Sequence, residues 1–217
     1  MIQLGGLAAA GFQAVDSIAG QVVVCSCGIP TSPHYGVNLG GLALTKVSRQ
    51  IIVKGKWHEF SCAVRADGVT SPAREFLEAL QAGHWKHEVE DLKPDEQISD
   101  GAKFLSWIEF FAEQGYPPRR HHINYLDEGI WEFRKAAKRL SFYDTDGAGD
   151  FVPKVKIDDR DRDSCSPAAD SDCWDLPDLD YKVRLGHAFP KVSAKTRPFD
   201  LAEAKKVRRE DLEHDRQ

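Results

Sequence analysis

The stretch that decides the fold reads Leu126-Asp-Glu-Gly-Ile-Trp-Glu-Phe-Arg134 and, after three intervening residues, Lys138-Arg-Leu-Ser-Phe-Tyr143. Apolar side chains alternate with charged ones in both pieces, which is typical of strands that bury one face and expose the other. Several of the charged positions are arginine or lysine, whose cationic groups suit phosphate binding. We therefore predict two paired strands, at 129–135 and 138–143, whose basic face could hold an RNA backbone.

The basic character continues toward the C-terminus. A strand is expected at 181–185, and the sequence Arg184-Leu-Gly-His-Ala-Phe-Pro-Lys191 then predicts a glycine–histidine turn. Further cations follow in Lys195-Thr-Arg-Pro198, directly before a basic helix predicted at about 199–214.

The segment before the strand pair predicts one strand, two helices and another strand. Residues 56–64 have the mixed apolar pattern of a strand, and Ser71-Pro72 is a capping serine followed by proline at the first helical position of a helix over 72–82. A second helix is expected from about Asp100 to Gly115, and a strand at about 121–126. The adjacent His121 and His122 are interpreted as sheet residues rather than metal ligands.

The acidic charge of the chain is concentrated in one segment. The formal net charge is −5, but residues 144–180 alone hold 12 acidic and 4 basic side chains, a net of −8. The segment has few apolar residues, which favours a solvated loop that projects from the sheet. A calcium loop is the alternative, but the glycine and glutamate of an EF-hand are missing at their places.

The first 52 residues are almost uncharged up to residue 45 and show no clear amphipathic period. A small extra domain, a disordered arm and upstream sequence included by a misplaced start are the three interpretations. A poorly ordered or non-native extension is the one we favour, which leaves 53–217 as the main domain. The basic start of a signal peptide is missing.

Cysteine usage and hydropathy bear on the compartment. The five cysteines are an odd number, which does not suit a secreted disulfide framework and favours a reducing cytoplasm. No apolar run approaches the roughly 18 to 20 residues needed to cross a membrane. The Cys25/Cys27 and Cys165/Cys173 pairs lack the spacing of a zinc site, so we expect neither a metal nor a cofactor.

The order of these elements and the quoted motifs resemble the RelE/HigB superfamily of type II toxins, in particular its phage-derived HigB-like branch. The resemblance covers about 56–143 and 181–214 and rests on the stretches 126–134, 138–143 and 185–198. It implies an α+β fold in which a small twisted antiparallel sheet carries two N-terminal helices on one side and a C-terminal helix.

The resemblance also implies an activity, which is metal-independent cleavage of messenger RNA in the ribosome. A ribose 2′-hydroxyl would attack the adjacent phosphate, which requires a proton acceptor, a proton donor and cations around the phosphate. The expected partners are the ribosome with its mRNA and a cognate helix-turn-helix antitoxin. The resemblance assigns a catalytic set of Arg139, Arg134, Lys191, His187 and Tyr143, and an RNA-binding set of Lys138, Lys195, Arg197 and Arg184.

Structural roles compete with each assignment. Arg134 and Arg139 could pair with Glu132 or Asp127 across the strand pair, Tyr143 could be a packing residue, and His187 could be a structural histidine. The sequence also departs from RelE, since Ile130 and Glu132 stand where RelE carries lysines. The acidic insertion lies in a hairpin that is tight in most relatives, and it could act as a mimic of nucleic acid.

Two other functions therefore stand beside the mRNA endonuclease. One is a ParE-like toxin that poisons DNA gyrase with the same fold. The other is a non-catalytic descendant that only binds a partner.

Overall fold

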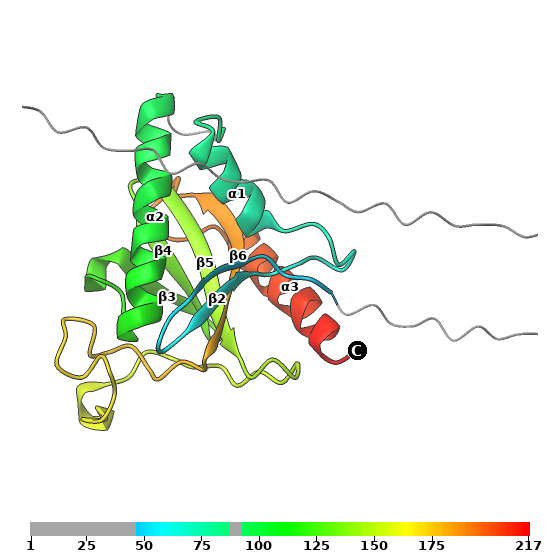
Figure 1. The fold of residues 1–217 in the computed structure, drawn as a ribbon. Helices are drawn as coiled ribbons and strands as arrows, with labels where there is room; N and C mark the ends of the chain where they lie inside the picture. The colour runs from blue at the N-terminus through cyan, green and yellow to red at the C-terminus, as the bar shows by residue number, and fades with distance from the viewer. Residues whose placement is uncertain (1–46, 87–92) are drawn as a thin grey trace, which may run out of the picture. The chain divides into compact units, whose positions relative to one another are not determined.

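Six strands form one mixed sheet in the part of the chain that the computed structural model describes, residues 47–86 and 93–217 (Figure 1). Their order across the sheet is β1-β2-β6-β5-β4-β3. The strands are β1 (Ile51–Lys54), β2 (Glu59–Cys62), β3 (Ile123–Asp127), β4 (Ile130–Lys135), β5 (Lys138–Thr145) and β6 (Lys182–Pro190).

The sheet is not purely antiparallel, which corrects the prediction. β2 and β6 pair in parallel, whereas the other neighbours are antiparallel. After β2 the chain passes through two helices to the far edge of the sheet and returns strand by strand. β6 therefore lies beside β2 and points in the same direction. This long connection is what a parallel pair requires, since a tight hairpin can join only antiparallel strands.

The predicted strand pair is confirmed as β4 and β5. Phe133 lies opposite Leu140 and Trp131 opposite Phe142, and all four side chains are buried in the main core. Next to the Phe133–Leu140 pair, on the other face, Arg134 lies opposite Arg139. The alternation in the sequence therefore reports the two faces of the sheet correctly.

Two helices cover one face of the sheet, as expected (Figure 1). α1 (Pro72–Gln81) begins at the predicted cap, and α2 (Pro94–Gln114) ends at Gly115, which adopts a φ of 83°. α2 begins six residues before the predicted Asp100. Pro94 occupies the first turn, followed by Asp95 and Glu96, which suit the positive end of the helix dipole.

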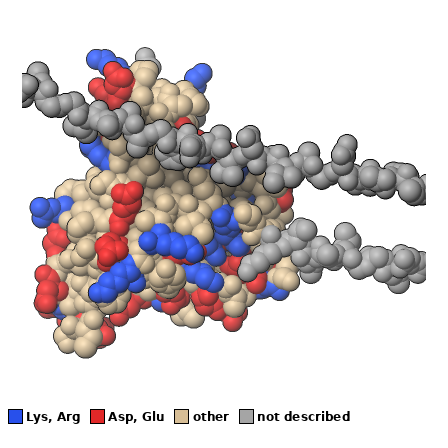
Figure 2. All heavy atoms as spheres, viewed as in Figure 1, with Lys and Arg blue, Asp and Glu red and all other residues tan. Residues whose placement is uncertain are grey.

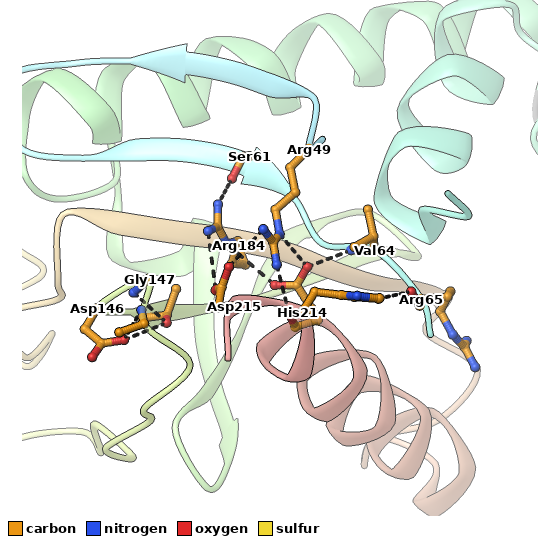
Figure 3. Close-up of polar contacts among 12 residues, drawn as sticks. Arg49, Ser61, Val64, Arg65, Asp146, Gly147, Arg184, His214 and Asp215 are labelled. Atoms are coloured by element: carbon orange, nitrogen blue, oxygen red, sulfur yellow. Dashed lines mark hydrogen bonds and ion pairs between the residues drawn. The ribbon is translucent and has the colours of Figure 1, made fainter. Parts of the chain in front are cut away.

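The third helix, α3 (Pro198–Asp215), packs on the opposite face. Val207 and Leu212 lie there against Tyr143 and Ala63 in a small second core. Asp211 is fully buried between them, and it accepts hydrogen bonds from Arg49 Nε (2.7 Å) and from the Val64 backbone N–H (2.9 Å). Figure 3 shows this polar cluster where α3 meets the sheet.

The predicted glycine–histidine turn is wrong, because β6 runs through it to Pro190. Register shifts between Leu140 and Phe142, where β5 pairs with β6, so the extra residue forms a bulge. A Cβ on Gly186 would lie 2.9 Å from Ser141 Oγ, and glycine is therefore needed for the close approach of the two strands.

Strand β1 extends the fold into the predicted N-terminal extension. Residues 47–52 belong to the described unit, and Arg49 and Ile51 contribute to its packing and pairing. The remainder of the predicted extension, residues 1–46, lies outside the described residues.

The acidic insertion differs from the free loop predicted for it. Ala168, Cys173 and Leu176 are buried in the main core, and the Trp131 indole N–H donates to the Lys154 carbonyl oxygen (3.2 Å). In Figure 1 the insertion runs from the end of β5 past the C-terminal end of α2. The apolar residues of the insertion that are buried all lie at 168–176, and they anchor it.

None of the helices in the described ranges combines the length and the apolar character that a membrane span requires.

Candidate functional site

A buried glutamate lies at the centre of the candidate site. Glu132 projects from β4 on the face opposite α1 and α2, and only 1% of its surface is exposed. The Arg139 Nε lies 3.6 Å from its carboxylate, and the Asn124 side-chain amide donates to Oε1 at 3.3 Å. Its other oxygen, Oε2, has no hydrogen-bond partner among the described residues.

Burial raises the pKa of Glu132, and the positive charges of Arg139, Lys191 and Arg134 only partly oppose that rise. The carboxylate is therefore a stronger proton acceptor than an exposed one. The resemblance assigns no catalytic role to this residue, which stands where RelE carries a lysine. Its predicted alternative role, pairing with an arginine of the strand pair, is confirmed for Arg139. Its single sequence signal was a charge at a position whose neighbours on the strand are apolar.

Two arginines lie directly opposite each other beside this glutamate. The Arg139 Nη1 donates to the backbone carbonyl oxygens of Ala136 (2.8 Å) and Lys138 (2.7 Å), which fixes the guanidinium. The buried Nε atoms of Arg134 and Arg139 both lack a hydrogen-bond partner in the described part of the chain. A guanidinium held in this way beside a second arginine is suited to a phosphate.

These arginines open onto a hollow of about 390 Å³. Its far wall is formed by the ring of Trp107 from α2, which stacks on His122 with 3.7 Å between ring centroids. Burial lowers the pKa of His122 to about 4, so this imidazole is neutral at physiological pH. His121 and His122 belong to a 3₁₀ turn at Arg120–His122 rather than to the strand predicted from 121.

Of the two other predicted catalytic residues on this side of the sheet, Lys191 lies near Glu132 whereas His187 does not. The Lys191 backbone N–H donates to the Ala137 carbonyl oxygen (2.6 Å), and its half-buried side chain contributes to the field at Glu132. His187 lies beside α3 instead, with its Nε2 3.7 Å from Asp200 and its ring stacked on Phe189. Burial lowers the pKa of His187, so its neutral form is favoured.

Three predicted site residues are buried, and partners from other elements bind their polar groups. Lys138 is fully buried on the opposite face, where its Nζ donates to Asp100 Oδ2 of α2 at 2.9 Å. Arg184 is 5% exposed and donates to the Ser61 hydroxyl beneath α3 (Figure 3). Tyr143 is 1% exposed, its hydroxyl donates to Asp211 at 2.9 Å, and burial raises its pKa well above the ordinary value.

These positions do not fit the predicted roles of Lys138 and Arg184 in RNA binding or of Tyr143 in catalysis. The resemblance suggested the roles, but partners far away in the sequence bind and bury each group.

Two further predicted cations lie on the segment between β6 and α3. Lys195 is exposed, whereas Arg197 is tied to Asp200 by hydrogen bonds of 2.6 and 3.2 Å. Lys195 is thus more open to a ligand than Arg197. On the face seen in Figure 2, cationic and anionic side chains are interspersed, so that face has no continuous basic area.

The structure therefore gathers Arg134, Arg139 and Lys191 around Glu132. In the described ranges, no group of three or more histidine, cysteine, aspartate or glutamate residues is placed to hold a metal ion. Comparison of the chain with known protein families and with curated proteins gave no match.

Proposed function

We propose that this chain is a translation-dependent mRNA endonuclease, the toxin of a type II toxin–antitoxin pair with a RelE-like arrangement of its fold. The observation that carries the proposal is the cluster of Arg134, Arg139 and Lys191 around the buried Glu132. Its cations can neutralise a phosphate, and a carboxylate with a raised pKa can accept a proton.

The reaction assigns a role to each group. The Glu132 carboxylate takes the proton of a ribose 2′-hydroxyl, and the 2′-oxygen forms a bond to the adjacent phosphorus. The bond from phosphorus to the 5′-oxygen breaks, and Lys191 supplies the proton to that oxygen. The products are a 2′,3′-cyclic phosphate and a 5′-hydroxyl, and Arg134 and Arg139 stabilise the charge on the pentacoordinate phosphorus.

The test is expression of the full chain in bacteria with mapping of message ends. We expect growth arrest and cleavage of translated messages, and the Glu132→Gln and Arg134→Ala variants should lower cleavage by about 100-fold or more. Arg160→Ala is the matched control, because this arginine is 88% exposed on the insertion and lies outside the cluster. Normal growth and intact messages with folded, expressed protein would refute the nuclease.

The near burial of the Arg139–Glu132 pair favours a second candidate, a descendant of the fold that only binds a partner. That protein would leave messages intact and the cluster variants would change nothing. A third result, growth arrest with intact messages and gyrase-dependent DNA breaks, would support the ParE-like alternative.

The proposal includes a helix-turn-helix antitoxin as partner. Co-expression of the neighbouring open reading frame should restore growth and yield a co-purifying complex. Failure of both would contradict this part of the proposal.

A further inference from the structure

A second hollow, of about 500 Å³, adjoins the cluster along the edge strand β3. Arg134 and His121 line both this hollow and the one described above, so the two hollows adjoin at these residues. A hollow of this size is in the range that small ligands occupy. Its lining comes from the 3₁₀ turn, β3, β4 and the acidic insertion, and includes Arg120, Tyr125, Trp131, Lys156, Asp172 and Asp175.

One side of this hollow is aromatic. Tyr125 is half-buried on β3, and its ring packs edge-on against Trp131 with 5.2 Å between centroids. The Trp131 ring is held in turn by its hydrogen bond to the insertion at Lys154. The half-buried Tyr125 ring, fixed against Trp131, is a platform on which an unstacked nucleobase can lie.

The side contributed by the insertion presents hydrogen-bond donors. Asp175 is 5% exposed, and its carboxylate binds Arg120 Nη2 (2.6 Å) and Lys156 Nζ (2.8 Å). The carboxylate is thereby used up, while about half of each cationic side chain remains exposed. Asp172, at the rim, adds one exposed carboxylate as an acceptor.

We propose that this hollow is a base-binding subsite, built in part by the acidic insertion, which prefers guanine in single-stranded RNA. The inference rests on the proposed function, because the phosphate of the same nucleotide would lie at Arg134 between the two hollows. Guanine offers the acceptors O6 and N7 to Arg120 and Lys156, and its N–H groups to Asp172. Adenine has a donor in place of O6, so it would face two cations with the wrong group.

The test measures binding and needs no cleavage. The full chain is titrated calorimetrically with 5′-GMP, 5′-AMP and the RNA trinucleotides UGU and UAU. We expect the guanine ligand to bind about tenfold more tightly than the adenine ligand in each pair. The trinucleotide UGU should bind more tightly than 5′-GMP, because its additional phosphate contacts the arginine cluster.

Two variants and one control locate the preference. Arg120→Ala and Lys156→Ala should each bring the ratio of guanine to adenine affinity close to one. Lys156→Ala keeps the Arg120–Asp175 pair that anchors the insertion. Arg160→Ala, on the same insertion but outside the hollow, should leave it unchanged. Melting temperatures confirm that each variant is folded.

Each outcome decides the proposal. Equal binding of guanine and adenine ligands, or a preference that survives both variants, would overturn the subsite. Tighter binding of 5′-GMP than of UGU would identify a free nucleotide as the ligand and would overturn RNA reading. A guanine preference in a protein that does not cleave messages would leave the subsite standing and refute only the nuclease.

Discussion

At the scale of the residue, Glu132 has two features that lower the stability of the folded protein. Its carboxylate is almost completely buried, and one oxygen lacks a hydrogen-bond partner among the described residues. Such a group costs free energy of folding, and residues of this kind concentrate at functional sites. The sequence placed a charge at this position and left its pairing with Arg134 or Arg139 open, whereas its burial came from the structure.

The pH dependence of stability follows from the raised pKa of Glu132. Above its ordinary value of 4.5, the unfolded chain loses this proton while the folded protein still holds it. The folded state therefore loses stability as pH rises from 4.5 through the folded pKa. We expect Glu132→Gln to remove this loss, so that its free energy of unfolding relative to the unaltered protein increases between about pH 4 and pH 7.

Urea unfolding at a series of pH values checks this prediction. Glu109→Gln, at an exposed position of α2, is the control and should show no such trend. A difference between Glu132→Gln and the unaltered protein that stays constant with pH would contradict it.

At the scale of the element, one buried carboxylate connects α3 to the sheet. Asp211 is fully buried and binds Arg49, the Val64 N–H and the Tyr143 hydroxyl, with Arg184 at 3.6 Å. Removing a buried charge partner typically costs about 3–5 kcal/mol. We expect Asp211→Ala to lower the free energy of unfolding by about that amount, as measured by chemical denaturation.

Glu213→Ala on the same helix is the matched control. Its carboxylate pairs with the exposed Arg216, at 3.1 Å, so the expected change is below about 1 kcal/mol. Equal effects of the two variants would show that the buried cluster does not hold α3.

The insertion is an element with two parts. Its segment at 168–176 is anchored in the core, whereas Arg160 is 88% exposed and Arg162 38% exposed. We expect trypsin to cut the native insertion first after one of these arginines, because exposed chain is cleaved most readily. The two fragments should stay associated on size exclusion, since each contributes to the core.

Mass spectrometry of the fragments identifies the cut. The double variant Arg160→Gln with Arg162→Gln should resist cleavage within the insertion. Earlier cleavage after Lys154, or separation of the fragments, would show that the anchoring is weaker than its burial indicates.

At the scale of the whole molecule, the N-terminal boundary of the fold decides a truncation experiment. A chain that starts at residue 53 lacks Arg49 and half of β1, whereas one that starts at residue 47 keeps both. Loss of Arg49 leaves the buried Asp211 without its closest cation. The shorter chain should therefore be less stable than the longer one by about 3 kcal/mol or more, measured by urea unfolding.

A comparison of these two chains needs no assumption about residues 1–46. Similar stabilities would contradict the prediction, and would mean that Arg184 alone can neutralise Asp211. For the same reason, an activity test on a chain that starts at residue 53 would confuse a lost site with a lost fold.

The sequence by itself determined the local structure of this protein. Alternation at 129–143 reported the two faces of β4 and β5, and Ser71-Pro72 and Gly115 marked helix ends, since these signals depend on neighbouring residues. The prediction of a turn near the end of β6 is wrong because glycine is frequent in turns, whereas pairing with β5 keeps that segment extended.

The tertiary structure alone decided which charged groups can function. Lys138 and Arg184 have the same charge as Arg134, but their partners lie on α2 and α3, far away in the sequence. The insertion is a second example. Its composition predicts a free loop, but in the folded chain a few of its apolar residues are buried in the main core. Composition and periodicity describe what each segment can do, whereas burial and charge neutralisation depend on what the folded chain places beside it.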